Sequence, residues 1–242
     1  MRALALAAGL LAAGEAGAVC RQALALGLDV SGSVDLAEYR LQREGLAAAL
    51  GAPQVRAALL DVPGTFVMIA VYEWSGPDNQ VEILPWTAIR SATELDAARG
   101  RIREVERRRE GSNTALGAAM AHGLALLMQV PDCWRHTLDI SGDGKSNAGA
   151  EPASILVPTT VTINGLVIGA DDARTGDARL LQVGELSAYY AREVLHGPGA
   201  FLEIALGFED FEAAMTRKLL QELQVIAIGA LDDGAPAGRP DQ

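Results

Sequence analysis

The chain has 242 residues, of which 50% are hydrophobic and 21% charged, so it can bury a large core and is neither disordered nor of low complexity. Its formal charge of −11 has the wrong sign for binding phosphates or anionic lipid, which argues against a nucleic-acid partner. Because aromatic residues make up only 5%, the core must consist mainly of Ala, Leu, Val and Ile, which favours an α/β architecture with helices on both faces of a parallel sheet.

The amino end has the pattern of a secretory signal peptide. A positive Arg2 precedes an apolar stretch, residues 3–13, that is too short to span a bilayer, and small residues follow at 16–18. We therefore expect residues 1–18 to be removed. A lipoprotein signal is the alternative because Cys20 follows closely, although a valine stands directly before it. No other segment reaches about 18 apolar residues, so the mature protein is predicted to lack a membrane span and to be periplasmic or secreted.

From Cys20 onward, short apolar runs alternate with longer amphipathic stretches, which is typical of βαβ units. The predicted strands lie at 24–28, 65–74, 81–84, 136–140, 161–168 and 201–206, and the predicted helices at 36–50, 93–109, 115–128, 177–195 and 210–224. The turn residues at 75–79 predict a hairpin between the second and third strands. We expect one domain over residues 19–230 and a flexible tail over 231–242.

The predicted helix at 93–109 is rich in charge. Six arginines gather between residues 99 and 109, interleaved with Glu104 and Glu106. This pattern favours a solvated helix face, and a docking patch for an acidic partner is the alternative.

The two cysteines occupy similar places relative to two strands. Cys20 lies nine residues before Asp29, and Cys133 lies ten residues before Asp143. If the intervening strands are parallel neighbours, both cysteines fall at the same edge of the sheet, and an oxidising compartment would favour a disulfide. Two unpaired core thiols are the alternative.

Polar side chains gather where strands of the predicted sheet end. Asp29, Ser31 and Ser33 directly follow the first strand, Thr114 opens a helix, and Asp143 follows the fourth strand. The carboxyl ends of parallel strands are where open α/β sheets bind ligands. Hydroxyl and carboxylate oxygens suit a small hard cation such as Mg²⁺.

These residues, in this order, resemble the metal-ion-dependent adhesion site of von Willebrand factor A (VWA) domains. The resemblance covers nearly the whole mature chain and implies a Rossmann-like VWA fold, with an open, doubly wound, mostly parallel sheet of about six strands, one antiparallel edge hairpin and helices on both faces. The stretches Tyr72–Gly76, Pro85–Thr87 and Gly197–Phe201 are similar to a bacterial branch of that superfamily of unknown function.

The resemblance implies a role for each residue. Ser31, Ser33 and Thr114 would give hydroxyl oxygens to Mg²⁺, Mn²⁺ or Ca²⁺, and Asp29 and Asp143 would act mostly through bound water. An open coordination position would take a Glu or Asp carboxylate of a partner protein. The chain is thus interpreted as an exported binding module and not an enzyme, with a VWA scaffold whose metal site has lapsed as the alternative.

One residue departs from the family pattern. Gly142 stands where the family often has a larger residue, which bears on the position of Asp143. The alternative for the whole pattern is a purely structural role, in which Asp29 and Ser33 cap the first helix and Asp143 caps the next one.

The sequence also contains partial signals of two enzyme classes. A nucleotide hydrolase is suggested by Gly144-Lys145-Ser146, but Asp139 stands where the phosphate-binding loop needs glycine. A serine hydrolase would need a Gly-x-Ser-x-Gly elbow, which is missing, and a partner histidine. The three histidines are scattered, at His122, His136 and His196.

Overall fold

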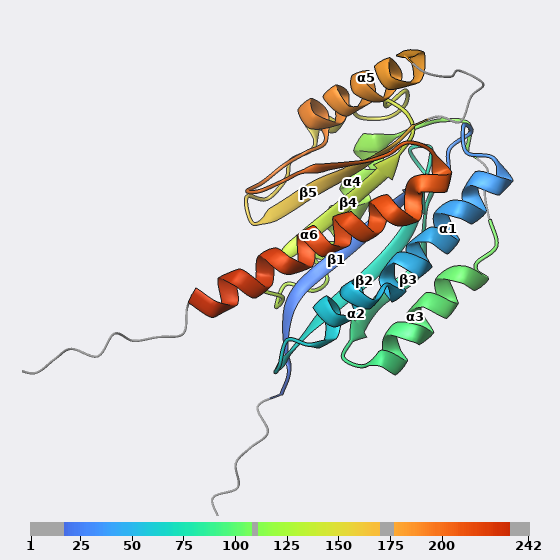
Figure 1. Cartoon of the computed structure of the whole chain (residues 1–242). Coiled ribbons are helices and arrows are strands. Elements are labelled where there is room, and N and C mark those ends of the chain that lie inside the picture. Colours follow the sequence, from blue (N-terminus) through green and yellow to red (C-terminus); the bar gives the residue numbers. More distant parts are fainter. Residues whose placement is uncertain (1–16, 108–110, 170–176, 233–242) are drawn as a thin grey trace, which may run out of the picture.

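A six-stranded sheet forms the centre of this computed structural model, which describes residues 17–107, 111–169 and 177–232 (Figure 1). The strand order is β3-β2-β1-β4-β5-β6, and every neighbouring pair is parallel except β2 and β3. The strands are β1 (Val19–Asp29), β2 (Thr65–Trp74), β3 (Gln80–Ile89), β4 (His136–Gly142), β5 (Val161–Ile168) and β6 (Leu202–Ala205). The predicted parallel sheet with one antiparallel edge hairpin is confirmed.

Helices cover both faces of the sheet. They are α1 (Leu36–Gly51), α2 (Pro53–Leu60), α3 (Ala92–Glu104), α4 (Leu116–Leu127), α5 (Asp177–Glu193) and α6 (Phe211–Asp232). One apolar cluster joins α1, α2, α3 and α6 to the sheet face that carries Leu24, Leu26 and Leu28. A second cluster joins α4 and α5 to the face that carries Ala23 and Ala25. This two-sided cover is the doubly wound arrangement that was expected.

Three differences from the predicted helices are larger than two residues. Helix α2 was not predicted; Pro53 fits its first turn, where proline loses no hydrogen bond. Helix α3 ends at Glu104 instead of residue 109, and α6 continues to Asp232 instead of stopping at 224. The predicted signal segment lies outside the described residues except for 17 and 18, and of the predicted tail only residues 231 and 232 are described.

The predicted disulfide between Cys20 and Cys133 is confirmed. Their Cα atoms lie 4.6 Å apart, and 113 positions separate them in sequence. The bond joins the amino end of β1 to the segment that leads into β4, where the backbone N–H of Trp134 also donates to the Cys20 carbonyl at 3.1 Å. It therefore lies at the opposite edge of the sheet from the carboxyl ends of β1 and β4.

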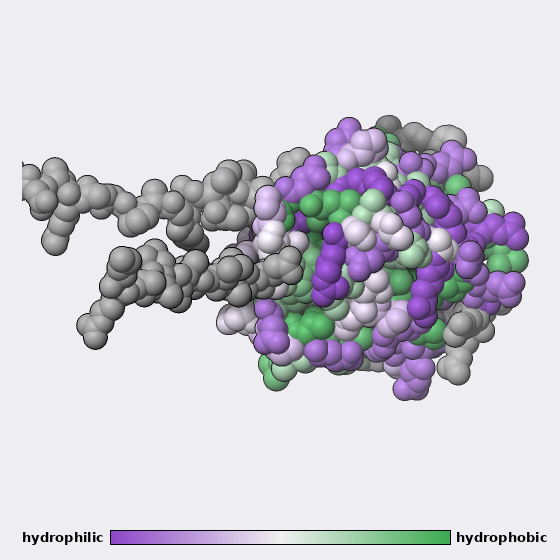
Figure 2. All heavy atoms as spheres, turned by 90° about the horizontal axis from the view of Figure 1, so that it is seen from below, coloured by the Kyte–Doolittle hydropathy of each residue, from purple (hydrophilic) through white to green (hydrophobic). Residues whose placement is uncertain are grey.

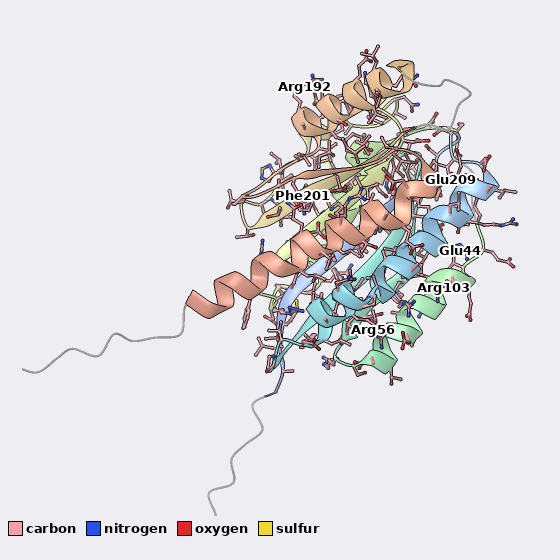
Figure 3. The ribbon with its side chains drawn as sticks, viewed as in Figure 1. Glu44, Arg56, Arg103, Arg192, Phe201 and Glu209 are labelled. Atoms are coloured by element: carbon pink, nitrogen blue, oxygen red, sulfur yellow. A yellow bond between two sulfur atoms is a disulfide. The ribbon has the colours of Figure 1, made fainter. Side chains whose placement is uncertain are left out.

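The arginine-rich segment is only partly a solvated face. Arg101 and Arg103 are exposed, as predicted, and Figure 3 labels Arg103 where α3 runs alongside α1. That interpretation is wrong for Arg99 and Arg107. The Nε of Arg99 donates to the Ala47 carbonyl at 2.7 Å, and the Arg107 guanidinium donates to backbone carbonyls of the loop after β1. Arg108 and Arg109 lie outside the described residues.

A cluster of buried charges lies between α6 and the sheet. The Lys218 ammonium, with no exposed surface, contacts the carboxylates of Asp139 and, at 2.7 Å, Glu222. Asn164 donates to the same Glu222 oxygen, and the ammonium lies 5.0 Å from the centre of the Phe201 ring, which is labelled in Figure 3. Burial, reinforced by the Glu222 charge, holds the pKa of Asp139 well above its usual value. The two carboxylates outweigh the effect of burial on Lys218 and raise its pKa.

In the described part of the chain, no helix is both long enough and apolar enough to cross a bilayer. On the face seen in Figure 2, hydrophilic side chains surround smaller hydrophobic patches.

Candidate cation site

The loop after β1, the segment around Thr114 and the loop after β4 meet beyond the carboxyl ends of β1, β2 and β4. The loop after β1 is tied to β2 by the backbone N–H of Val30, which donates to the Trp74 carbonyl at 2.8 Å. The backbone N–H of Ala115 donates to the Ser75 carbonyl at 2.7 Å, which brings Thr114 to the end of β2. The predicted site residues therefore share one edge of the sheet, where its topology places ligands.

A chain of hydrogen bonds links four of these residues. The Ser31 backbone N–H donates to Asp29 Oδ1 at 2.8 Å. The hydroxyl oxygens of Ser31 and Ser33 lie 3.2 Å apart, and Ser33 donates to Asp143 Oδ1 at 2.8 Å. The loops after β1 and β4 thus bring two hydroxyls and two carboxylates together, with Asp29 and Ser31 buried and Ser33 exposed to solvent.

Thr114 joins the site through the loop after β4. Its backbone N–H donates to Asn147 Oδ1 at 2.8 Å, and its carbonyl accepts from the Asn147 N–H at 2.8 Å. A Cβ on Gly144, directly after Asp143, would lie 3.7 Å from Thr114 Oγ1. The Thr114 hydroxyl therefore faces the backbone beside Asp143, although it makes no hydrogen bond to the other four residues.

The pKa values of the two carboxylates, Asp29 and Asp143, are both raised. Burial and then the charge of Asp143 raise the pKa of Asp29 to about 8, against the opposing effect of hydrogen bonds from Ser31 and from the Asp143 backbone. Burial likewise raises the pKa of Asp143, although Ser33 lowers it in part. Asp29 Oδ2 is buried and has no hydrogen-bond partner. A hard divalent cation with its bound water would supply what this oxygen lacks, so the residues present fit such an ion.

Gly142 is required by packing next to the site. A Cβ at this position would lie 2.5 Å from Tyr190 Oη, 2.9 Å from Asp29 Oδ2 and 3.3 Å from Trp74 Cζ2. Only glycine lets the β4 backbone approach these groups so closely. With glycine at this position, the Asp143 carboxylate accepts a hydrogen bond from the Ser33 hydroxyl at 2.8 Å.

Several residues around the site were missed in the sequence. Tyr190 Oη and Trp74 Nε1 are buried without a hydrogen-bond partner, and both crowd Gly142 beside Asp29. Trp74 pairs with Asp29 in the register of β1 and β2, so the strand alignment held a signal for it. Tyr190 on α5 and Asn147 carried no such signal, because only the tertiary fold brings them there.

The capping alternative is wrong for the first helix. The N-cap of α1 is Asp35, whose side chain accepts from the backbone of Ala37 and Glu38 in a reciprocal capping box. Asp29 and Ser33 are therefore free of that role. Asp143 caps no helix either, since the next described helical turn, Pro152–Ser154, has Glu151 as its N-cap, with no side-chain hydrogen bond.

The residues that suggested enzymes do not converge. Asp139 is paired with Lys218 beneath α6, and the Ser146 hydroxyl contacts the backbone of Thr114. In the ranges that the structure describes, no group of three or more His, Cys, Asp or Glu side chains is placed to hold a metal ion.

Comparison with known proteins places the fold. A family model described as "Protein of unknown function (DUF1194)" matches residues 19–227. No curated protein matches the sequence. Among solved structures, the chain is similar to proximal thread matrix protein 1 from the mussel byssus with a zinc-occupied MIDAS motif, at 15% identity and a TM-score of 0.55, covering 86% of this chain and 47% of that one.

Two further solved structures have the same fold. Pilus adhesin SpaC from Lactobacillus rhamnosus GG is 13% identical with a TM-score of 0.58, over 86% of this chain and 31% of that one. A von Willebrand factor type A protein from Catenulispora acidiphila is 14% identical with a TM-score of 0.51, over 84% and 42%. The chain spans less than half the length of each of these proteins. The expected VWA fold is thus confirmed.

Proposed function

This chain belongs to the DUF1194 family and has the fold of VWA domains, and from this premise we propose that it is a binding module that holds one divalent cation and uses it to capture a carboxylate of a partner protein. The observation that carries the proposal is the buried, unpartnered Asp29 Oδ2 beside a second carboxylate, Asp143. Keeping a buried carboxylate in its charged form is costly, and a cation with its water would offset that cost.

The five residues would hold the ion in two different ways. Ser31, Ser33 and Thr114 would offer hydroxyl oxygens, and Asp29 and Asp143 would orient bound water. Hard oxygen donors of this kind suit Mg²⁺ first, with Mn²⁺ and Ca²⁺ as alternatives. The zinc-occupied MIDAS motif of the mussel protein supports a divalent ion in this fold, although the likeness is only 15%.

The partner chemistry follows from charge. When bound, the cation would supply positive charge and an open coordination position for a carboxylate oxygen. The chain as a whole carries a formal charge of −11 without the cation and would repel an acidic protein. An attraction to a Glu or Asp side chain would therefore be confined to the cation and would depend on it. The described contacts of the three histidines are with Tyr72, Val130 and Ile163, and none of these contacts involves Asp29 or Ser33. We therefore propose binding and not catalysis, which would need a positioned acid or base.

We also propose where the module acts. Residues 1–18 would be removed as a signal peptide, and residues 19–230 would form the VWA-like domain in the periplasm or outside the cell. The Cys20–Cys133 disulfide supports an oxidising compartment.

Chelation should separate specific capture from background. Immobilised protein incubated with the extracytoplasmic fraction of its own cells is expected to retain a partner in Mg²⁺ and to release it in EDTA. Asp29→Ala should retain none, because the variant loses the carboxylate that orients bound water. Asp132→Asn removes an exposed acidic charge far from the site and should behave as wild type. Retention that survives both EDTA and Asp29→Ala would overturn the proposed mechanism.

A further inference from the structure

We propose that Arg107 is a positioning residue for the cation site, which ties the hydroxyl-bearing loop after β1 to the segment that leads toward Thr114. The inference rests on the proposed function. Arg107 Nη2 donates to the carbonyls of Val30 at 2.9 Å and Ser31 at 3.4 Å, and Nη1 donates to the carbonyl of Val34 at 2.9 Å. One planar guanidinium thus holds the loop at three points that enclose Ser33.

These three carbonyls fix the part of the loop that carries the donors. The Val34 N–H closes a turn onto the Ser31 carbonyl at 3.0 Å, so both ends of this turn are held by the same guanidinium. The hydroxyls of Ser31 and Ser33 project from within the turn and lie 3.2 Å apart. Without Arg107, three carbonyls would lose a charge-assisted partner, and the spacing of the two hydroxyls would no longer be enforced.

The guanidinium is itself held in place from α1. It lies 5.6 Å from the centre of the Tyr39 ring, and the Tyr39 hydroxyl donates to Glu73 Oε1 at 2.6 Å in the core. Arg43 lies 5.3 Å from the same ring and donates to the Val105 carbonyl at 2.6 Å. The segment before Arg107 is therefore anchored to α1, which gives the side chain a fixed base from which to hold the loop.

The positive charge of Arg107 and its proposed positioning role predict opposite changes in cation affinity when the side chain is removed. A guanidinium near a cation site repels the cation, so removing its charge would tighten binding if charge were its main effect. If Arg107 acts by fixing the loop, removing it should weaken binding. The sign of the change in affinity therefore distinguishes a positioning role from a bystander charge.

The test is the affinity for Mn²⁺, measured by calorimetric titration of the disulfide-bonded protein. We expect Arg107→Met to weaken Mn²⁺ binding by about 10- to 100-fold, as loss of a residue that orients metal ligands does. Arg107→Lys keeps the charge without the planar fork and should restore part of the loss. Arg101→Met is the matched control, because Arg101 is exposed on α3, and it should leave the affinity unchanged. Binding by folded Arg107→Met that is as tight as wild type, or tighter, would overturn the inference.

Hydrogen exchange in the metal-free protein gives a second readout that does not depend on the cation. The amides of residues 30–34 should exchange at least about tenfold faster in Arg107→Met, while the amides of the sheet stay protected. If wild type binds no Mn²⁺, the proposed function fails, and unchanged exchange in this loop would separately overturn the role of Arg107. If Arg107→Met does not fold, Arg107→Lys takes its place in both measurements, and unchanged affinity and exchange then count against the role.

Discussion

Lys218→Met is expected to lower the free energy of unfolding by about 3 to 5 kcal/mol, because it leaves Asp139 and Glu222 buried without their counter-charge. The loss should be measured by urea unfolding near neutral pH. The chain's other lysine, Lys145, is 52% exposed, so Lys145→Met should change stability by less than about 0.5 kcal/mol.

The loss caused by Lys218→Met should depend on pH. The pKa of Asp139 is already raised in the folded protein, and without Lys218 it rises further. A folded state that holds a proton which the unfolded chain releases becomes less stable as pH rises above about 4. The variant should therefore lose less stability near pH 5 than near pH 8. A loss below about 1 kcal/mol, or one equal at both pH values, would contradict this view of the cluster.

The disulfide is expected to have an effect of similar size. Closing a loop of 113 positions stabilises by about 4 to 5 kcal/mol in the chain-entropy model, an upper figure because residual structure in the unfolded chain reduces it. The double variant Cys20→Ser, Cys133→Ser should lose up to that amount in urea unfolding.

Reduction provides the control for the disulfide prediction. Wild type treated with reductant should unfold at the same urea concentration as the double variant, and the double variant should not respond to reductant. Thiol titration of the oxidised protein under denaturing conditions should find no free thiol. Two free thiols in correctly exported protein would contradict the bond.

Strand-based features were predictable from the sequence. The two cysteines lie at nearly equal distances before Asp29 and Asp143, and parallel neighbouring strands turn equal distances into equal heights. The same reasoning placed both carboxylates at one edge, because the side of a parallel sheet that binds ligands is fixed by strand direction.

Contacts made across the fold were not predictable. In charge pattern, Arg107 resembles its exposed neighbours, but its hydrogen-bond acceptors are backbone carbonyls more than 70 residues earlier, which no side-chain pattern encodes. Asp139 alternates with apolar residues in β4, and its partner Lys218 lies 79 positions away on α6. Buried polar pairs of this kind depend on which helix covers which strand, and that is decided only by tertiary packing.

The central claim, that Asp29 and its neighbours hold one divalent cation, is tested most directly by calorimetric titration of Mn²⁺ in buffers of different ionisation enthalpy. Asp29 has a pKa of about 8, so it is mostly protonated near pH 7 and must give up its proton to a bound cation. We predict one Mn²⁺ per chain, release of close to one proton near pH 7, and an affinity that rises almost tenfold from about pH 6 to about pH 7. Asp29→Asn and Thr114→Val should weaken binding, and Asp132→Asn should not. A folded wild-type protein that takes up no Mn²⁺, or one that binds it as tightly after Asp29→Asn, would contradict the account.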